Sequence, residues 1–270
     1  MRSEHHSKLP DDVAREWATL SAVSAMPRAF RPDSVEALPP TAQRWLTASI
    51  RPGTPLWKSA TFHMRGEIRL RGLWVPFTAS QVLRPDSGFI WTARTRIRGI
   101  PVQGFDRFAN GEGTMRWRLL NVVPVMSASG ADVTASARGR LVGEGVLLPT
   151  AFDGAEYRPG DDPNSVHVRR TVGDSSEEAQ FWIDDAGHLA KLRMLRWGDP
   201  DGRGFGRFPF GMDVVDSAEF DGVLVPSHFR AGWWSGTDRS AEGEFFRARL
   251  TDVTFPRPAA RSAGVTDETA

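Results

Sequence analysis

The feature that most constrains the fold is an alternation of apolar and polar residues that begins near residue 61 and returns along most of the chain. In the first segment the apolar positions alternate with threonine, histidine, arginine and glutamate; they are Phe62, Met64, Ile68 and Leu70. Segments 89–98 and 114–119 repeat the pattern, with Trp91 and Trp117 among the apolar positions. Successive side chains of a β-strand point to opposite faces, so this period predicts strands with one buried face.

Turn-forming sequences separate the alternating segments. Asn110-Gly111 and Asp221-Gly222 are dipeptides of the kind that supplies the positive φ angles of tight hairpins. Later strands are expected at 166–172, 179–183, 189–197, 214–220, 223–234 and 244–255. Hairpin following hairpin favours an antiparallel meander over alternating strands and helices.

Three helices are expected in addition to the sheet. Asp11 or Asp12 can cap a helix near residues 11–20, and Thr41 can cap one that extends to residue 50. The third helix, 131–148, interrupts the strands; its apolar residues fall in one narrow sector at a helical period and are Val133, Ala137, Leu141 and Leu148. Glu144 falls in the same sector, and a carboxylate there needs a partner.

These elements predict a mainly β (α+β) fold. We expect a curved antiparallel sheet, or incomplete β-barrel, wrapped around the inserted helix and preceded by N-terminal helices. At 270 residues, an all-β chain of this size commonly forms one domain. The predicted organisation is a tail at 1–10, one domain at 11–255 with its helical part at 11–50 and its sheet at 58–255, and a tail at 256–270.

Composition excludes several classes of protein. A net charge of +1 gives no basic excess for nucleic acid, and because all but three of the 34 basic residues are arginines, we attribute them first to a GC-rich genome. Without cysteine there are no disulfides and no thiolate metal ligands. No apolar run is long enough to be a transmembrane segment, and WATLSAVSAM is a poor signal peptide, so a cytoplasmic location is expected. The oligomeric state is left open.

Familiar catalytic and cofactor motifs are missing or poorly spaced. Gly202, Gly204 and Gly206 have the spacing G-x-G-x-G without a following helix, which is typical of a loop rather than a phosphate site. The histidines are scattered, and Ser235 lacks the spacing of a nucleophile elbow. We therefore expect no cofactor and no metal.

Aromatic residues give the clearest functional signal, because the chain contains ten Trp and 16 Phe. Core packing explains some of them, but a curved sheet that one helix only partly fills would leave an aromatic cavity. The predicted aromatic ligand contacts are Phe89, Trp91, Trp117, Phe181, Trp197, Phe208, Phe229 and Trp233. Phe208 comes from the glycine-rich loop 198–211, a candidate lid.

Charged residues occur among the aromatic positions. Asp106 and Glu144 are the candidate catalytic residues, and Arg94 or Arg116 is the candidate partner for them or for the head group of a ligand. A structural salt bridge would explain the same residues equally well.

Several stretches of the sequence resemble a known family. They are PDSGFIWTAR, DRFANGEGTMRWRLLNVVPV, GRLVGEGVLLPTAF, GVLVPSHFRAGWW and GEFFRARLTDVTF, and the resemblance covers roughly residues 38–255. The chain resembles a family of uncharacterised bacterial proteins common in actinobacteria, whose architecture is similar to the lipoprotein-carrier (LolA/LolB-like) half-barrel. The resemblance implies a fold that shelters greasy ligands, and it assigns no activity. The family positions matched here are Trp91, Asp106, Gly111, Glu144, Pro149, Pro226 and Trp233.

Three functional hypotheses follow. The first is binding of a lipophilic small molecule in an aromatic cavity. The second is a cofactor-independent cyclase or isomerase of secondary metabolism that uses the same cavity, with Asp106 or Glu144 as general acid or base. The third is a scaffold protein whose interior is fully packed and whose edge strands bind partners.

Overall fold

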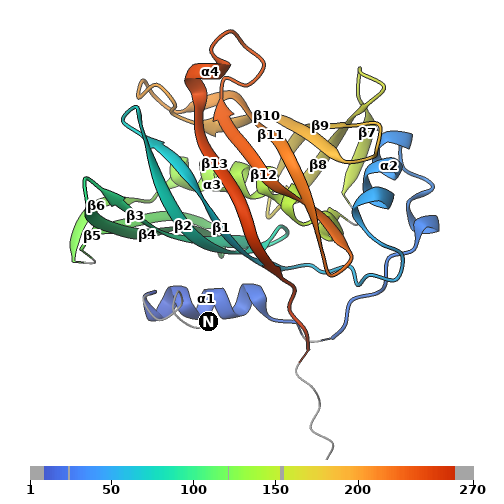
Figure 1. Ribbon diagram of the computed structural model, residues 1–270, viewed down its shortest axis with the longest axis horizontal. Coiled ribbons are helices and arrows are strands. Elements are labelled where there is room, and N and C mark those ends of the chain that lie inside the picture. The colour runs from blue at the N-terminus through green and yellow to red at the C-terminus, as the bar shows by residue number, and fades with distance from the viewer. Residues whose placement is uncertain (1–8, 24, 121, 153–154, 259–270) are drawn as a thin grey trace, which may run out of the picture.

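The computed structural model describes residues 9–23, 25–120, 122–152 and 155–258, and its main feature is one 13-stranded antiparallel sheet (Figure 1). The strands are β1 (Ala60–Leu70), β2 (Leu73–Arg84), β3 (Gly88–Ile97), β4 (Ile100–Ala109), β5 (Glu112–Leu119), β6 (Val123–Ala128), β7 (Glu156–Pro159), β8 (Ser165–Val172), β9 (Ser175–Ile183), β10 (Leu189–Gly198), β11 (Gly206–Phe220), β12 (Val223–Trp233) and β13 (Glu244–Thr254). The helices are α1 (Asp11–Ser21), α2 (Pro40–Ser49), α3 (Ala131–Glu144) and α4 (Ser240–Gly243), with 3₁₀ turns η2 (Pro32–Val35), η3 (Gly145–Leu147) and η4 (Pro149–Phe152).

Two meanders make up this sheet. Strands β1–β6 form one and β7–β13 form the other, and they join where β1 pairs with β13 in the middle of the sheet. Since β6 and β7 are at opposite edges, the chain between them must cross the whole sheet, and α3 makes that crossing on the inner, concave face (Figure 1). The predicted fold class, a curved antiparallel half-barrel around one inserted helix, is confirmed.

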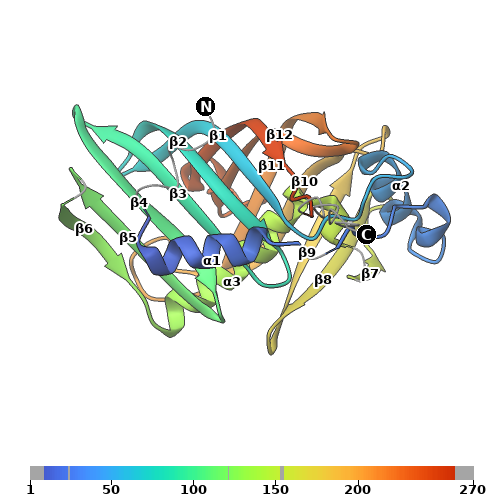
Figure 2. The ribbon, with the colours of Figure 1, turned by 90° about the horizontal axis from the view of Figure 1, so that it is seen from below.

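Helices α1 and α3 cover opposite faces of the first meander. Helix α1 lies along the outer face of the sheet (Figure 2), where its Val13, Trp17 and Leu20 pack on Ile90 and Phe105. Phe89 and Trp91, the neighbours of Ile90 on β3, point inward and pack in the main core with Leu141 of α3. The period of two thus places one set of residues under each helix.

The helix starts differ from the predicted caps. Helix α1 begins at Asp11 itself, with Pro10 at the cap position and no side-chain capping bond. Helix α2 begins at Pro40, and the Thr41 hydroxyl donates instead to the carbonyl of Pro163 at 2.9 Å. Proline supplies the fixed φ of a helix start without a capping side chain, which explains why the Asp and Thr predictions were wrong.

Helix α3 is shorter than the predicted 131–148 segment, because it ends at Glu144 and continues as η3. Two glycines bring it close to β10. A Cβ added at Gly139 would lie 3.0 Å from Cγ of Arg196, and one added at Gly143 would lie 3.3 Å from the sulfur of Met194. Because these two positions carry no side chain, α3 packs close to β10.

The part of the interior next to α2 is packed around an aromatic cluster. Trp45 of α2 contacts Phe152 and Phe181 edge-to-face, with ring centroids 5.2 Å away in both cases, and the two phenylalanines are 5.6 Å apart. All three side chains are fully buried. The tails predicted at 1–10 and 256–270 lie mostly outside the described residues.

Candidate functional site

A cavity of about 390 Å³ lies between α3 and the concave face of the sheet. Its sheet side is largely aromatic and includes Phe89, Trp91, Phe210, Phe229, Phe245 and Phe246. Helix α3 contributes smaller or charged side chains, namely Val133, Ser136, Ala137, Arg140, Gly143 and Glu144. Short side chains on the helix do not reach the aromatic wall, so the space between them remains open.

The aromatic wall is held together by ring contacts that extend across the middle of the sheet. Phe246 stacks on Phe77 at 5.2 Å and on Phe229 at 6.2 Å, and Trp91 meets Phe77 at 5.6 Å. A bulge in the pairing of β12 with β13, between Ala231 and Gly232, adds an extra residue to β13. Both Phe245 and its neighbour Phe246 then line the cavity, although adjacent residues of a regular strand face opposite ways.

Asp106, Arg140 and Glu144 form a buried ionic cluster on the cavity wall. Arg140 donates from Nη1 to Oδ2 of Asp106 at 2.9 Å and from Nε to Oε1 of Glu144 at 2.7 Å. The other two carboxylate oxygens accept bonds from the Trp117 indole at 2.9 Å and from the Gln81 amide at 2.7 Å. Every carboxylate oxygen of the cluster thus has a donor, as buried charges require.

Burial and the charge of the ion-pair partner act in opposite directions on the pKa of Asp106 and on that of Arg140. Desolvation by burial raises the pKa of Asp106 above its ordinary value, although the charge of Arg140 opposes this shift. Burial alone would lower the pKa of Arg140, but the charges of Glu144 and Asp106 outweigh it and raise that pKa. The guanidinium also lies over the rings of Phe89, at 4.6 Å, and Trp91, at 5.2 Å.

The predicted cluster of Asp106 and Glu144 with Arg94 or Arg116 is corrected in one respect: the cation is Arg140. Arg94 and Arg116 line a separate pocket of about 70 Å³ together with Leu9 and Pro10, which precede α1. Arg94 pairs with Gln103 across β3 and β4, whereas Asp106 pairs with Trp91. Arg94 is three positions after Trp91 and Arg116 is one position after Met115, both of which line the cavity, so the two arginines lie on the α1 side of the sheet.

The other predicted ligand contacts are divided among three places. Phe89, Trp91 and Phe229 line the cavity, and Trp117 lies behind the wall, 5.7 Å from Trp91. Phe181 belongs to the packed cluster with Trp45 and Phe152. The three remaining residues lie near the cavity without lining it; they are Trp197, whose indole donates to Asp132, Phe208, which packs on Trp234, and Trp233, which packs on Phe210.

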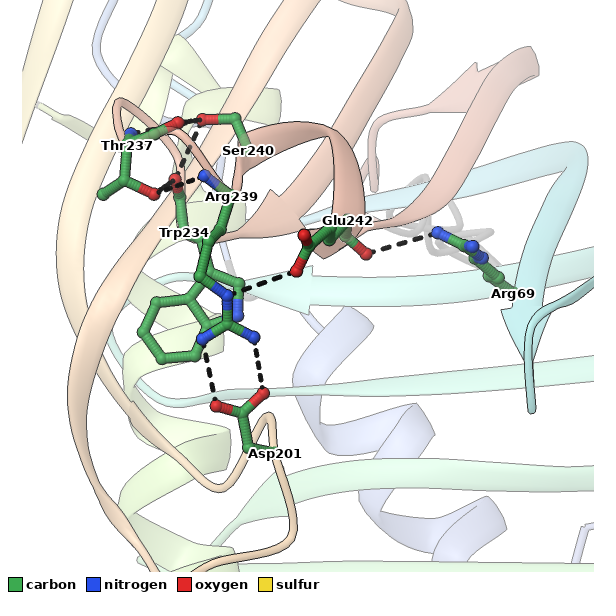
Figure 3. A network of polar contacts seen from close by, with 7 residues as sticks. All are labelled: Arg69, Asp201, Trp234, Thr237, Arg239, Ser240 and Glu242. Atoms are coloured by element: carbon green, nitrogen blue, oxygen red, sulfur yellow. Dashed lines mark hydrogen bonds and ion pairs between the residues drawn. The ribbon is translucent and has the colours of Figure 1, made fainter.

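The loop between β10 and β11 carries Phe205, which lines the cavity although its side chain is 45% exposed. The cavity therefore meets the surface at this loop. Arg239, which follows β12, donates from Nη1 and Nη2 to the two carboxylate oxygens of Asp201 in the loop, at 3.1 and 2.9 Å (Figure 3). Its guanidinium also covers the ring of Trp234 at 4.3 Å and binds Glu242 at 3.2 Å. We call this contact between Arg239 and Asp201 the loop clasp.

Sequence reasoning missed the three arginines of the cavity, Arg107, Arg140 and Arg196. Arg140 could have been found from its position, because it precedes Glu144 by four residues on one face of α3. Arg196 gave no such signal. The pairing of β10 with β9 shifts between Leu189 and Lys191, and after this bulge Leu192, Met194 and Arg196 are the buried positions. Without the bulge, Trp197 is the expected inward residue.

Within the described part of the chain, no helix is long and apolar enough to cross a membrane. The same residues contain no group of three or more His, Asp or Glu side chains arranged to hold a metal ion.

Comparison with known proteins gives a family and three similar folds. Residues 28–245 match a family of unknown function, DUF6544, which confirms the expected membership of an uncharacterised family. No curated protein matches the chain.

Three solved structures are similar to it in fold. A putative outer membrane lipoprotein-sorting protein domain from Vibrio parahaemolyticus has 9% identity and a TM-score of 0.44 over 76% of this chain and 88% of that one. A LolA superfamily protein from Nitrosomonas europaea has 9% identity and a TM-score of 0.43, covering 80% and 92%. A DUF1329 family protein from Desulfovibrio piger has 11% identity and a TM-score of 0.43, covering 84% and 92%.

Proposed function

Since the chain belongs to the DUF6544 family, whose function is unknown, we propose a function from its interior: it binds a lipophilic small molecule between α3 and the aromatic wall of the half-barrel. The observation that carries this proposal is the cavity of about 390 Å³. Small-molecule sites are concave, mostly apolar and roughly 300–1,000 Å³ in volume, with a few fixed polar groups. This cavity has both the apolar wall and the fixed polar groups.

The first experiment is native mass spectrometry of the purified protein, compared with a denatured sample. We expect a defined additional mass in the native sample that is released on denaturation. In parallel, a fluorescent fatty-acid probe is titrated into the delipidated protein and into Ala231→Trp. Ala231 lines the cavity from β12, so the larger side chain fills the space and should abolish probe binding.

The matched control is Ala190→Trp, at an exposed position of β10 outside the cavity. It should bind the probe as the wild type does. No additional mass together with no probe binding by the wild type would refute the proposal.

A second candidate is a cofactor-independent cyclase or isomerase, and the raised pKa of Asp106 on the cavity wall favours it. Asp106 would act as general acid or base, with Glu144 beside it. Turnover of a flexible polyene by the wild type, lost in both Asp106→Asn and Glu144→Gln while binding persists, would support catalysis. Binding without turnover would leave the first proposal alone. The cavity itself counts against the third hypothesis, a scaffold with a fully packed interior.

A further inference from the structure

Three arginines line the cavity, and they differ in their partners. Arg107 pairs with Glu16 of α1, and Arg140 pairs with both Asp106 and Glu144. Arg196 has no carboxylate of a described residue within the 4.0 Å of an ion pair. Glu177, the remaining acidic group whose charge acts on it, is bound by Arg207 at 2.7 and 3.1 Å. Arg140 neutralises only one of its two carboxylates, so the ionic cluster balances the charge of Arg196 at longer range, but no carboxylate of a described residue contacts Arg196 directly.

Arg196 is held in place from several sides. Its Nε and Nη2 atoms both donate to the carbonyl oxygen of Ser136 at 3.3 Å, and its side chain passes directly over Gly139 of α3. The guanidinium lies over the rings of Phe210, at 4.8 Å, and Trp233, at 5.1 Å. Among the described residues, its Nη1 atom has no hydrogen-bond partner. A planar guanidinium fixed in this way offers its remaining N–H groups in a set direction.

Arg196 also keeps its charge. Desolvation by burial, with a further contribution from the charge of Arg140, lowers the pKa of Arg196 to about 10, which still leaves it protonated at neutral pH. A buried guanidinium with N–H groups that lack an acceptor is unfavourable, and an anion bound in the cavity would accept them.

We infer that Arg196 binds the anionic head group of the ligand, and that the ligand is an apolar molecule ending in a carboxylate. This inference rests on the proposed function and adds a ligand class to it. A carboxylate carries a single negative charge and accepts N–H donors of a guanidinium in its plane. A phosphate monoester would add a second negative charge to a site that already holds Asp106, Glu144 and Glu177. The apolar body would lie against Phe229, Phe245 and Phe246.

The test compares a pyrene-labelled fatty acid with its methyl ester, which has the same apolar body and no charge. We expect the wild type to bind the acid at least tenfold more tightly than the ester, about 1.4 kcal/mol. Arg196→Met should bind the acid and the ester equally, with the ester affinity close to that of the wild type. Arg196→Lys, which keeps the charge but loses the planar fork, should retain only part of the preference for the acid.

The matched control is Arg193→Met on the same strand, since Arg193 does not line the cavity and packs on Trp182 instead. It should keep the full preference for the acid. Equal binding of acid and ester by the wild type, or an unchanged preference in Arg196→Met, would show that Arg196 does not bind the carboxylate. It would leave the proposed function intact. Binding of neither probe by the wild type would instead overturn the proposed function. Melting curves confirm that each variant is folded, and Arg196→Lys provides the comparison if Arg196→Met is not.

A separate observation concerns the outer ends of three hairpins, β1–β2, β3–β4 and β5–β6. Their turns project on the side of the half-barrel away from α2 (Figure 1). Large apolar side chains are exposed there, namely Leu73, Ile97, Ile100, Leu120, Val122 and Val123. We call these three turns with their flanking residues, 69–74, 94–103, 116–120 and 122–126, the hairpin rim.

The charge of the hairpin rim is of one sign. Its segments contain seven arginines and no Asp or Glu, although the whole chain is nearly neutral. Arg71, Arg96, Arg98 and Arg118 are exposed, and no ion pair involving them is present among the described residues. Exposed apolar residues mixed with arginines match the chemistry of an anionic lipid surface, where each basic residue contributes about 1 kcal/mol.

We propose that the hairpin rim docks on anionic membranes. The test is co-sedimentation with vesicles of phosphatidylcholine alone and of equal parts phosphatidylcholine and phosphatidylserine. We expect binding to the anionic vesicles alone, weakened by salt, and reduced at least tenfold in the triple variant Arg96→Gln, Arg98→Gln, Arg118→Gln. Val122→Ser with Val123→Ser should weaken it without changing its salt dependence.

The control is Arg51→Gln with Arg257→Gln, which removes the same kind of exposed charge outside the rim. It should bind as the wild type does. Equal binding to both kinds of vesicle, or no loss in the triple variant, would overturn the proposal. So would binding to a duplex DNA fragment that is tighter than binding to anionic vesicles.

Discussion

The interior of the half-barrel has two aromatic parts, a packed half under α2 and a hollow half under α3, which encloses the cavity and is lined by strands of both meanders. In the packed half, α2 and the 3₁₀ turns place Trp45, Leu148 and Phe152 against Phe181. In the hollow half, α3 places serine, alanine and glycine opposite aromatic rings of similar size. The strands alone therefore do not decide which half can hold a ligand. The size of the side chains on the covering helix decides it.

Removal of an aromatic ring should affect the two halves unequally. Phe181→Ala leaves a new void in a packed cluster and should lower the free energy of unfolding by about 3–5 kcal/mol. Phe229→Ala enlarges a cavity that already exists and should cost about 2 kcal/mol, near the low end of large-to-small substitutions. Urea denaturation of both variants measures the difference. Equal losses would mean that the cavity is filled in solution.

The ionic cluster should be the most sensitive part of the hollow half. Arg140→Met leaves the carboxylates of Asp106 and Glu144 buried without their cation and should cost about 3 kcal/mol. The further changes Asp106→Asn and Glu144→Gln remove the unpaired charges and should restore much of this loss. Urea midpoints of the single and triple variants test whether the loss of Arg140 acts through its interaction with the two carboxylates. A triple variant that is no more stable than Arg140→Met would contradict it.

Added volume should have opposite effects in the two halves. Ala231→Leu extends into the cavity and should leave stability unchanged or raise it by up to about 1 kcal/mol. Ala151→Leu inserts the same atoms into the packed half, where Ala151 is buried, and should cost about 1–3 kcal/mol. Thermal melts compare the two. Destabilisation of similar size in both would argue that the hollow half has no free space.

The loop clasp should respond to pH with little effect on overall stability. The hydrogen bonds from Arg239 hold the pKa of Asp201 below its ordinary 3.8, so the clasp is formed above that value and is lost as pH falls through the lowered pKa. Arg239→Ala should therefore increase amide exchange in the loop at neutral pH, as acid does in the wild type. Hydrogen exchange followed by mass spectrometry measures this. Unchanged exchange in Arg239→Ala would show that the clasp does not restrain the loop.

Much of the fold was predictable, because apolar and polar residues alternate along every strand that has one buried face and one polar face. Strand β2 escaped prediction for a physical reason. Its residues from Ala79 to Leu83 are buried on both faces, between α1 and the core, so the apolar pattern does not alternate. Pro76 within the strand weakens the signal further.

The candidate site was predictable in part. Phe89, Trp91, Phe229 and Glu144 were placed on the inner face from their strand or helix positions, Asp106 was chosen because it lies among aromatic residues, and the structure brings all five to one cavity. Arg196 was not predictable, because a bulge in β10 changes which residue faces inward. Register shifts of this kind arise from pairing with neighbouring strands and leave little trace in a single sequence.

The position of β13 has a consequence for the order of assembly. This strand is near the end of the chain, yet it lies in the middle of the sheet between β1 and β12. As synthesis proceeds, the two meanders can form separately, each with one unpaired inner edge, until the segment from Glu244 onward becomes available. Pairing of β1 with β13 joins residues from opposite ends of the chain, a contact of the kind that slows folding. The cavity, whose wall includes Phe245 and Phe246, is completed only at this last step.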